Sequence, residues 1–221
     1  RYLLVGGGPS APALSDALGR RLPLDHRQLD YLIIANPAEE HIAALPGILE
    51  RFPPAQVLWA GPTHASSSAR YLQSRLSEAG MQPLPTQSGQ IFDLGQGATL
   101  QVLSSNARGA VLLLEWRNFS ALLPMGVDAE TLVTLQKEPA PVTALLLAEG
   151  GYAPLNPPGW LDRLRPQVVL LSVSPGDRHG LPSPETMEAV KDYSLLRTDR
   201  NGWVELTTDG EQMWVEVEKQ R

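Results

Sequence analysis

Four polar side chains that could carry chemistry lie close together early in the sequence, between two apolar segments. They are Asn36, Glu39, Glu40 and His41. Residues 31–35 before them predict a buried strand, and residues 42–45 after them predict the first turns of a helix. A strand end that leads into a helix presents side chains and free backbone N–H groups together. Carboxylate and imidazole groups at such a place favour a metal site, but this loop alone has too few ligands for one.

Further ligands would have to come from distant parts of the sequence. Glu40 and His41 are neighbours, so on a helix their side chains point about 100° apart and cannot close a site by themselves. Glu149 and His179 are the candidates that could complete a ligand set with them. The alternative, which we favour, is that His41 is a partly buried helix residue and the glutamates are solvated charges.

The composition predicts a globular protein with one substantial core. The chain has 221 residues, of which 43% are hydrophobic and 19% are charged, and we predict a single domain over residues 1–221. Its formal net charge of −6 disfavours a surface that binds nucleic acid through phosphates alone, because such a surface needs clustered Lys and Arg. The sequence has no cysteine, which excludes disulfides and thiolate metal sites and fits an extracytoplasmic location.

No segment of the sequence approaches the roughly 20 apolar residues of a membrane span, and no signal peptide is visible. The sequence begins at Arg1 and runs almost at once into an apolar segment. We therefore expect the chain to be a piece of a longer protein.

Apolar periodicity and turn residues predict strands that alternate with helices in the first part of the chain. Expected strands cover residues 2–5, 29–35 and 56–60, and expected helices cover residues 11–21, 38–51 and 68–79. The first strand ends in Gly6-Gly7-Gly8-Pro9-Ser10, where Ser10 would cap the next helix. This loop lacks both the GxGxxG spacing and the Lys of a P-loop, so we favour a structural turn over a phosphate site.

After Gly80 the pattern changes to a meander of short strands. These strands are expected over residues 90–94, 98–104, 109–116 and 119–124, followed by a helix over 128–137. Later strands are expected over 142–148, 167–173, 195–198, 202–207 and 212–217, with helices over 160–165 and 183–191. Two mixed sheets packed face to face, with helices outside, satisfy this order and predict an α/β (α+β) fold, a four-layer αββα sandwich.

Six segments of the sequence carry a family resemblance. They are residues 3–9, residues 30–45, Asn106 with the strands after it, Arg165-Pro166-Gln167 with the strand that follows, Gly180-Leu181-Pro182-Ser183-Pro184 and Arg197-Thr198-Asp199-Arg200-Asn201-Gly202. In order and spacing they resemble the metallo-β-lactamase-like domain of ComEC-type competence proteins, which are membrane channels of bacterial DNA uptake. The resemblance covers nearly the whole chain and implies the αββα fold. It also implies a cleft at the sheet edges where two metal ions activate water against a phosphodiester.

The first half of that family's metal site is mostly lost in this sequence. The resemblance places its His-x-Asp-x-Asp-His motif on Asn36, Ala38, Glu40 and His41. The first His has become an amide, the first Asp has lost its carboxylate, the second has gained a methylene, and only the last His is kept. The Asp that ends the family's first strand falls on Gly6.

The second half of the metal site is lost in the same way. The family's metal-bridging Asp, in a Gly-Asp pair after the fourth meander strand, falls at Met125-Gly126, with Asp128 as the nearest carboxylate. The His-His-Gly-Ser loop falls on Glu149-Gly150-Gly151-Tyr152, and the His of the Gly-His-Pro motif falls on Leu181. So many losses together predict a scaffold that is kept without its metal chemistry.

Two hypotheses for the function follow. The first is a non-catalytic metallo-β-lactamase-like domain of a ComEC-type protein, without a cofactor, that contacts single-stranded DNA or the parent protein's membrane channel. Under this hypothesis the chain is an extracytoplasmic domain of a bacterial inner-membrane protein. The second is a divergent phosphodiesterase that acts on incoming DNA with zinc or manganese held by Glu40, His41, Glu149 and His179. We favour the first, because the sequence offers fewer ligands than the resemblance requires.

Two other kinds of site have weaker support. The serine run at residues 66–68 has neither a Gly-x-Ser-x-Gly elbow nor a strand leading straight into it, so helix capping explains it better than nucleophilic catalysis. Trp116-Arg117-Asn118-Phe119 is the one aromatic–Arg–aromatic arrangement that could stack on bases, although packing on a sheet face is the more usual role. His26 and His64 fall in polar loops, where we expect no chemical role.

Overall fold

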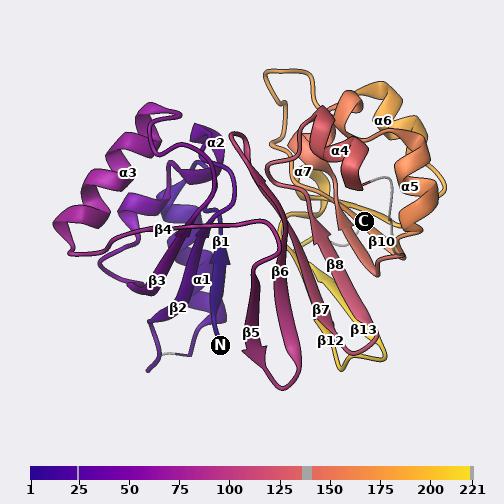
Figure 1. The fold of residues 1–221 in the computed structure, drawn as a ribbon. Helices are drawn as coiled ribbons and strands as arrows, with labels where there is room; N and C mark the ends of the chain where they lie inside the picture. The colour runs from indigo at the N-terminus through magenta and orange to yellow at the C-terminus, as the bar shows by residue number, and fades with distance from the viewer. Residues whose placement is uncertain (24, 136–140, 220–221) are drawn as a thin grey trace. The chain divides into compact units, whose positions relative to one another are not determined.

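The structure, a computed structural model, describes residues 1–23, 25–135 and 141–219 (Figure 1). The chain divides into two compact units. The first unit comprises Arg1–Gln90 and Val102–Ala110, and the second comprises Ile91–Gln101 and Val111–Arg221. Two strands contribute residues to both units, so the prediction of a single domain over 1–221 stays a prediction.

The first unit contains a four-stranded sheet in the order β1-β2-β3-β4. Its strands are β1 (Leu3–Val5), β2 (Leu29–Ile34), β3 (Pro54–Trp59) and β4 (Leu84–Pro85). All three pairings are parallel. The last three residues of both β2 and β3 are buried, as expected for a parallel sheet whose strands read as continuous apolar runs. The short edge strand β4 was not predicted from the sequence.

Two helices of the first unit, α1 and α3, begin at capping serines. Helix α1 (Ala11–Arg21) has the predicted bounds, and the Ser10 hydroxyl accepts a hydrogen bond from the Ala13 backbone N–H. Helix α3 (Ser67–Glu78) begins in the same way after Ser66, whose hydroxyl accepts from the Ala69 N–H. The serine run therefore caps a helix.

The predicted continuous helix over 38–51 is wrong. Helix α2 (Glu39–Ile42) ends after one turn, and a 3-10 turn (Leu45–Gly47) follows. Pro46 provides no backbone N–H and disfavours helical backbone at the residue before it. A Cβ atom at Gly47 would lie 2.7 Å from the Ala11 Cβ, so this turn also needs glycine to pack on α1.

The core of the first unit is formed where the helices cover the sheet. Its buried side chains come from β2, β3, α2, α3 and the segment after α2, and they include Leu32, Ile34, Ile42, Leu45, Ile48, Phe52, Trp59, Leu72 and Leu76. Burial of side chains of this size is the main favourable term for the unit.

The second unit is built on a seven-stranded mixed sheet in the order β11-β10-β9-β8-β7-β6-β5. Its strands are β5 (Ile91–Gly95), β6 (Ala98–Asn106), β7 (Gly109–Trp116), β8 (Phe119–Leu123), β9 (Ala144–Leu146), β10 (Val168–Leu171) and β11 (Leu195–Arg197). The β5–β6 and β7–β8 pairings are antiparallel, whereas β8 to β11 pair in parallel. The meander that the sequence predicts over 90–124 is therefore confirmed to within two residues at each strand end.

Helices and a separate hairpin complete the second unit. The helices are α4 (Ala129–Leu135), α5 (Pro158–Leu164), α6 (Pro184–Ala189) and α7 (Thr198–Asn201), and the hairpin consists of β12 (Val204–Thr208) and β13 (Met213–Val217). The predicted end of the fourth helix at Lys137 lies outside the described residues, and α7 lies between the strands predicted over 195–198 and 202–207, where no helix was predicted. Within the described part of the chain, no helix is both long and apolar enough to span a bilayer.

Candidate functional site

The loop after β2 holds the first group of predicted site residues. Asn36 is only 4% exposed, and its Oδ1 accepts a hydrogen bond from the Ala38 backbone N–H at 2.9 Å. This bond closes an Asx turn that leads the chain into α2. The buried amide therefore acts as a structural residue where the resemblance places the first His of the family's motif, and Ala38 offers no ligand atom at all.

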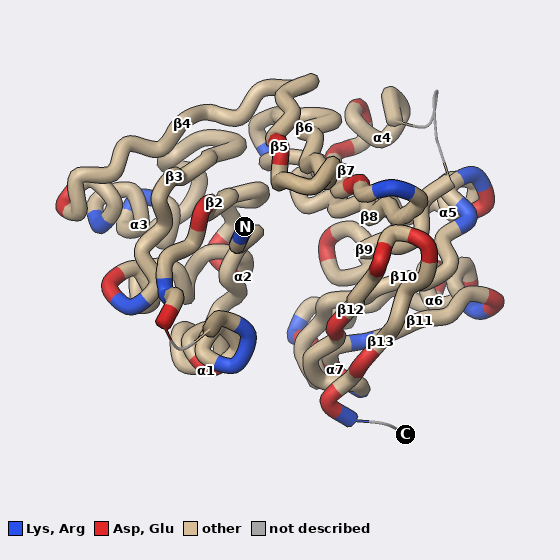
Figure 2. Tube along the Cα trace, turned by 90° about the horizontal axis from the view of Figure 1, so that it is seen from below, with Lys and Arg blue, Asp and Glu red and all other residues tan. Residues whose placement is uncertain are grey.

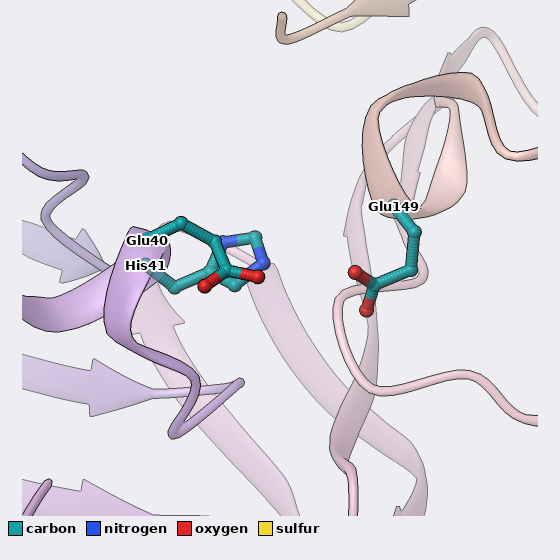
Figure 3. A group of neighbouring side chains, drawn as sticks. All are labelled: Glu40, His41 and Glu149. Atoms are coloured by element: carbon teal, nitrogen blue, oxygen red, sulfur yellow. The ribbon is translucent and has the colours of Figure 1, made fainter. Parts of the chain in front are cut away.

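Glu40 and His41 lie side by side on α2, as the sequence predicts (Figure 3). Glu40 is exposed, whereas His41 is half-buried. The His41 Nε2 atom is buried without a hydrogen-bond partner among the described residues. A buried unpaired nitrogen is uncommon in folded proteins and has to be explained.

The glycine loop after β1 is tied to the same turn through its backbone. The N–H groups of Gly7 and Gly8 donate to the His41 carbonyl oxygen at 2.7 and 2.9 Å, and the Gly6 N–H donates to Ile33. A Cβ atom at Gly7 would lie 2.5 Å from Leu45 Cδ2, so close packing requires the glycine there. The loop's N–H groups are used inside the first unit, which supports the structural interpretation over a phosphate site.

The segment that follows β9 holds the second group of predicted site residues. Glu149, Gly150 and Gly151 have consecutive positive φ values of 45°, 59° and 83°. This backbone is costly for glutamate. Figure 3 shows Glu149 on the turn that this segment forms.

A buried asparagine that we did not predict holds this segment in place. Asn156 is 2% exposed, and its Oδ1 accepts from the Ala148 N–H at 2.9 Å. Its Nδ2 donates to the carbonyl oxygens of Ala148 at 3.0 Å and Tyr152 at 2.8 Å. Three bonds from one side chain thus fix both ends of the turn that carries Glu149. The sequence gives no local signal for this role, because nothing in the run Leu155-Asn156-Pro157 indicates a buried amide.

Gly150 lies against Leu181 within the second unit. A Cβ atom at Gly150 would be 3.2 Å from Leu181 Cδ1, and one at Gly151 would be 2.8 Å from Pro182 Cβ. The two positions at which the resemblance expects metal-binding histidines are therefore brought together, but as an apolar contact.

The remaining candidates of the second unit have other partners. Gly126 is buried and has no side chain. The Asp128 Oδ1 accepts from the Thr131 N–H at 2.8 Å, so it caps α4. His179 is exposed, and its Nε2 lies 3.3 Å from the Arg178 Nε that donates to it. A guanidinium at that distance disfavours a second cation on the same nitrogen.

The described residues do not provide a closed metal site within either unit taken by itself. Among the described residues of either unit, no three His, Cys, Asp or Glu side chains converge within ligating reach of one another. The predicted set of Glu40, His41, Glu149 and His179 needs ligands from both units, so it stays a prediction. Two ligands from one unit do not fit the two-metal centre that the resemblance implies.

The predicted stacking platform is largely used for packing. The Arg117 guanidinium lies over the Trp116 ring, 5.1 Å from its centroid, and its Nη1 donates to the Asp209 carbonyl oxygen. Phe119 is 7% exposed and packs in a core cluster of the second unit. At most one of the two aromatic rings in this arrangement is therefore available to stack on a base.

Comparison with known proteins identifies the fold. No family model matches the chain, and no curated protein matches its sequence. Among solved structures, the zinc-bound PqqB from Methylobacterium extorquens aligns over 89% of this chain and 81% of its own, with 12% identity and a TM-score of 0.61. The metallo-β-lactamase fold protein YhfI from Bacillus subtilis aligns over 89% of this chain and 84% of its own, with 14% identity and a TM-score of 0.54. The chain has the metallo-β-lactamase fold.

The chain also aligns with part of a larger protein. A mutant of the β-hydroxylase CmlA aligns over 80% of this chain with 16% identity and a TM-score of 0.55. Our chain spans 44% of the CmlA chain, which is less than half of it. The predicted fold class is thus confirmed, while identities of this size say nothing about substrate.

Proposed function

We propose that this chain is a non-catalytic metallo-β-lactamase-like domain of a ComEC-type DNA-uptake protein, with a structural or binding role. The observation that carries the proposal is the state of the expected ligand positions. Gly6, Ala38, Gly126, Gly150 and Leu181 have no ligand atoms in their side chains, although the fold that would position such atoms is kept.

The local structure supports a loss of metal chemistry rather than a shifted ligand set. A binuclear hydrolytic centre needs several His and carboxylate groups on its ions, because the ions must stay bound while they lower the pKa of water. Here the Asn36 amide is committed to a backbone turn, and Asp128 caps a helix. Leu181 fills space against Gly150.

The assignment to a ComEC-type protein rests on the six segments that resemble that family. Under the proposal, the domain contacts single-stranded DNA or the membrane channel of its parent protein, on the extracytoplasmic side of a bacterial inner membrane. It needs no cofactor for either role.

Metal content is the measurement that tests the proposal. Protein purified without chelator and dialysed against zinc and manganese at neutral pH should hold less than about a tenth of an equivalent of either metal. The same samples should not hydrolyse bis-(p-nitrophenyl) phosphate above the rate of the metal salt alone. One or two tightly held equivalents together with turnover would overturn the proposal.

A metal-dependent phosphodiesterase acting on DNA is the second candidate function. The unpaired, buried Nε2 of His41 favours it, because a bound cation is one way to satisfy such an atom. In this case His41→Ala should remove the bound metal, whereas His64→Ala, at an exposed histidine, should leave it unchanged. Glu40, Glu149 and His179 would then be the next positions to substitute.

A further inference from the structure

We draw no further inference here: the strongest candidate, the acidic surface of the β12–β13 hairpin (Figure 2) where Trp203 and Trp214 are exposed, carries no proposal because nothing in the structure shows what covers it.

Discussion

Gly150 and Leu181 lie so close that a Cβ atom added to the glycine would be 3.2 Å from Leu181 Cδ1. The resemblance to ComEC-type domains places metal-binding histidines at both positions. In this structure the turn after β9 is held by apolar contact and by the Asn156 amide. A histidine introduced at either position would therefore disturb this packing.

The first prediction concerns Gly150 itself. Gly150→Ala should lower the free energy of unfolding by about 1–2 kcal/mol, because φ is +59° there and the new methyl group would press on Leu181. Urea denaturation measures the change. Gly159→Ala is the control, since that glycine lies in α5 with open space around it and the substitution should stabilise by up to about 1 kcal/mol. Equal losses at the two positions would contradict this account.

The second prediction concerns the side chain that holds the Glu149 turn. Asn156→Ala should cost about 3 kcal/mol, because it removes three hydrogen bonds and leaves buried backbone groups of Ala148 unpaired. The backbone amides around Glu149 should also exchange hydrogen faster, since the positive φ values lose their support. Gln167→Ala, at an exposed position, should stay within about 0.5 kcal/mol. Unchanged exchange in the turn would show that Asn156 does not hold it.

The third prediction concerns the approach of Gly109 to the loop after β2. A Cβ atom at Gly109 would lie 2.0 Å from the Ala35 carbonyl oxygen, and φ there is +138°. The same oxygen accepts from the Ala110 N–H at 2.7 Å, so the backbone cannot move away without losing that bond. Gly109→Ala should therefore cost about 3 kcal/mol or more in guanidinium denaturation.

A second glycine separates steric clash from backbone strain. Gly97 also has a positive φ, +80°, but nothing lies within 4 Å of its added Cβ. Gly97→Ala should cost only about 1–2 kcal/mol. A cost at Gly109 no larger than this would mean that the close approach to Ala35 does not matter.

Sequence patterns predicted the elements whose signals are local. The helix over 11–21 has the predicted bounds because a serine cap and Pro define its start. The strand over 109–116 also has the predicted bounds, because Gly and a turn define its ends. The break after Ile42 was missed although Pro46 signals it, because the apolar period on both sides of the proline continues without interruption.

The candidate site was predictable only in part. The adjacency of Glu40 and His41 follows from their spacing, whereas the loss of side-chain ligands rests on the resemblance and stays a prediction. The left-handed backbone of Glu149 depends on Asn156, seven residues later, and on contacts with Leu181 and Pro182. Such contacts join segments that are distant in the sequence, where periodicity carries no information about them.

A second unpredicted interaction joins Arg197 to Asp199. The Arg197 Nε and Nη2 atoms donate to the two Asp199 carboxylate oxygens at 2.9 and 2.7 Å. The two side chains are only 11% and 16% exposed. The hydrogen bond from Arg197 holds the pKa of Asp199 below its ordinary value of 3.8, and burial opposes that shift. The Arg–Asp pair belongs to one of the six segments that carry the family resemblance, and it joins the last residue of β11 to α7.

The fourth prediction follows from this depressed pKa. Asp199→Asn should lower the free energy of unfolding by about 2 kcal/mol at pH 7, because it removes a charge-assisted, bidentate pair. A carboxyl group with a lowered pKa in the folded state contributes stability above its unfolded pKa, and this contribution is lost as the pH falls through the folded pKa. The difference in free energy of unfolding between the wild type and Asp199→Asn should therefore be constant from pH 7 to about pH 5 and shrink below pH 3.8.

Urea denaturation at a series of pH values measures this difference. The control is Asp162→Asn, at an exposed position, which is expected to differ little from the wild type at any pH. A difference that grows with acidity would contradict the assignment, because it would require that folding raises the pKa of Asp199.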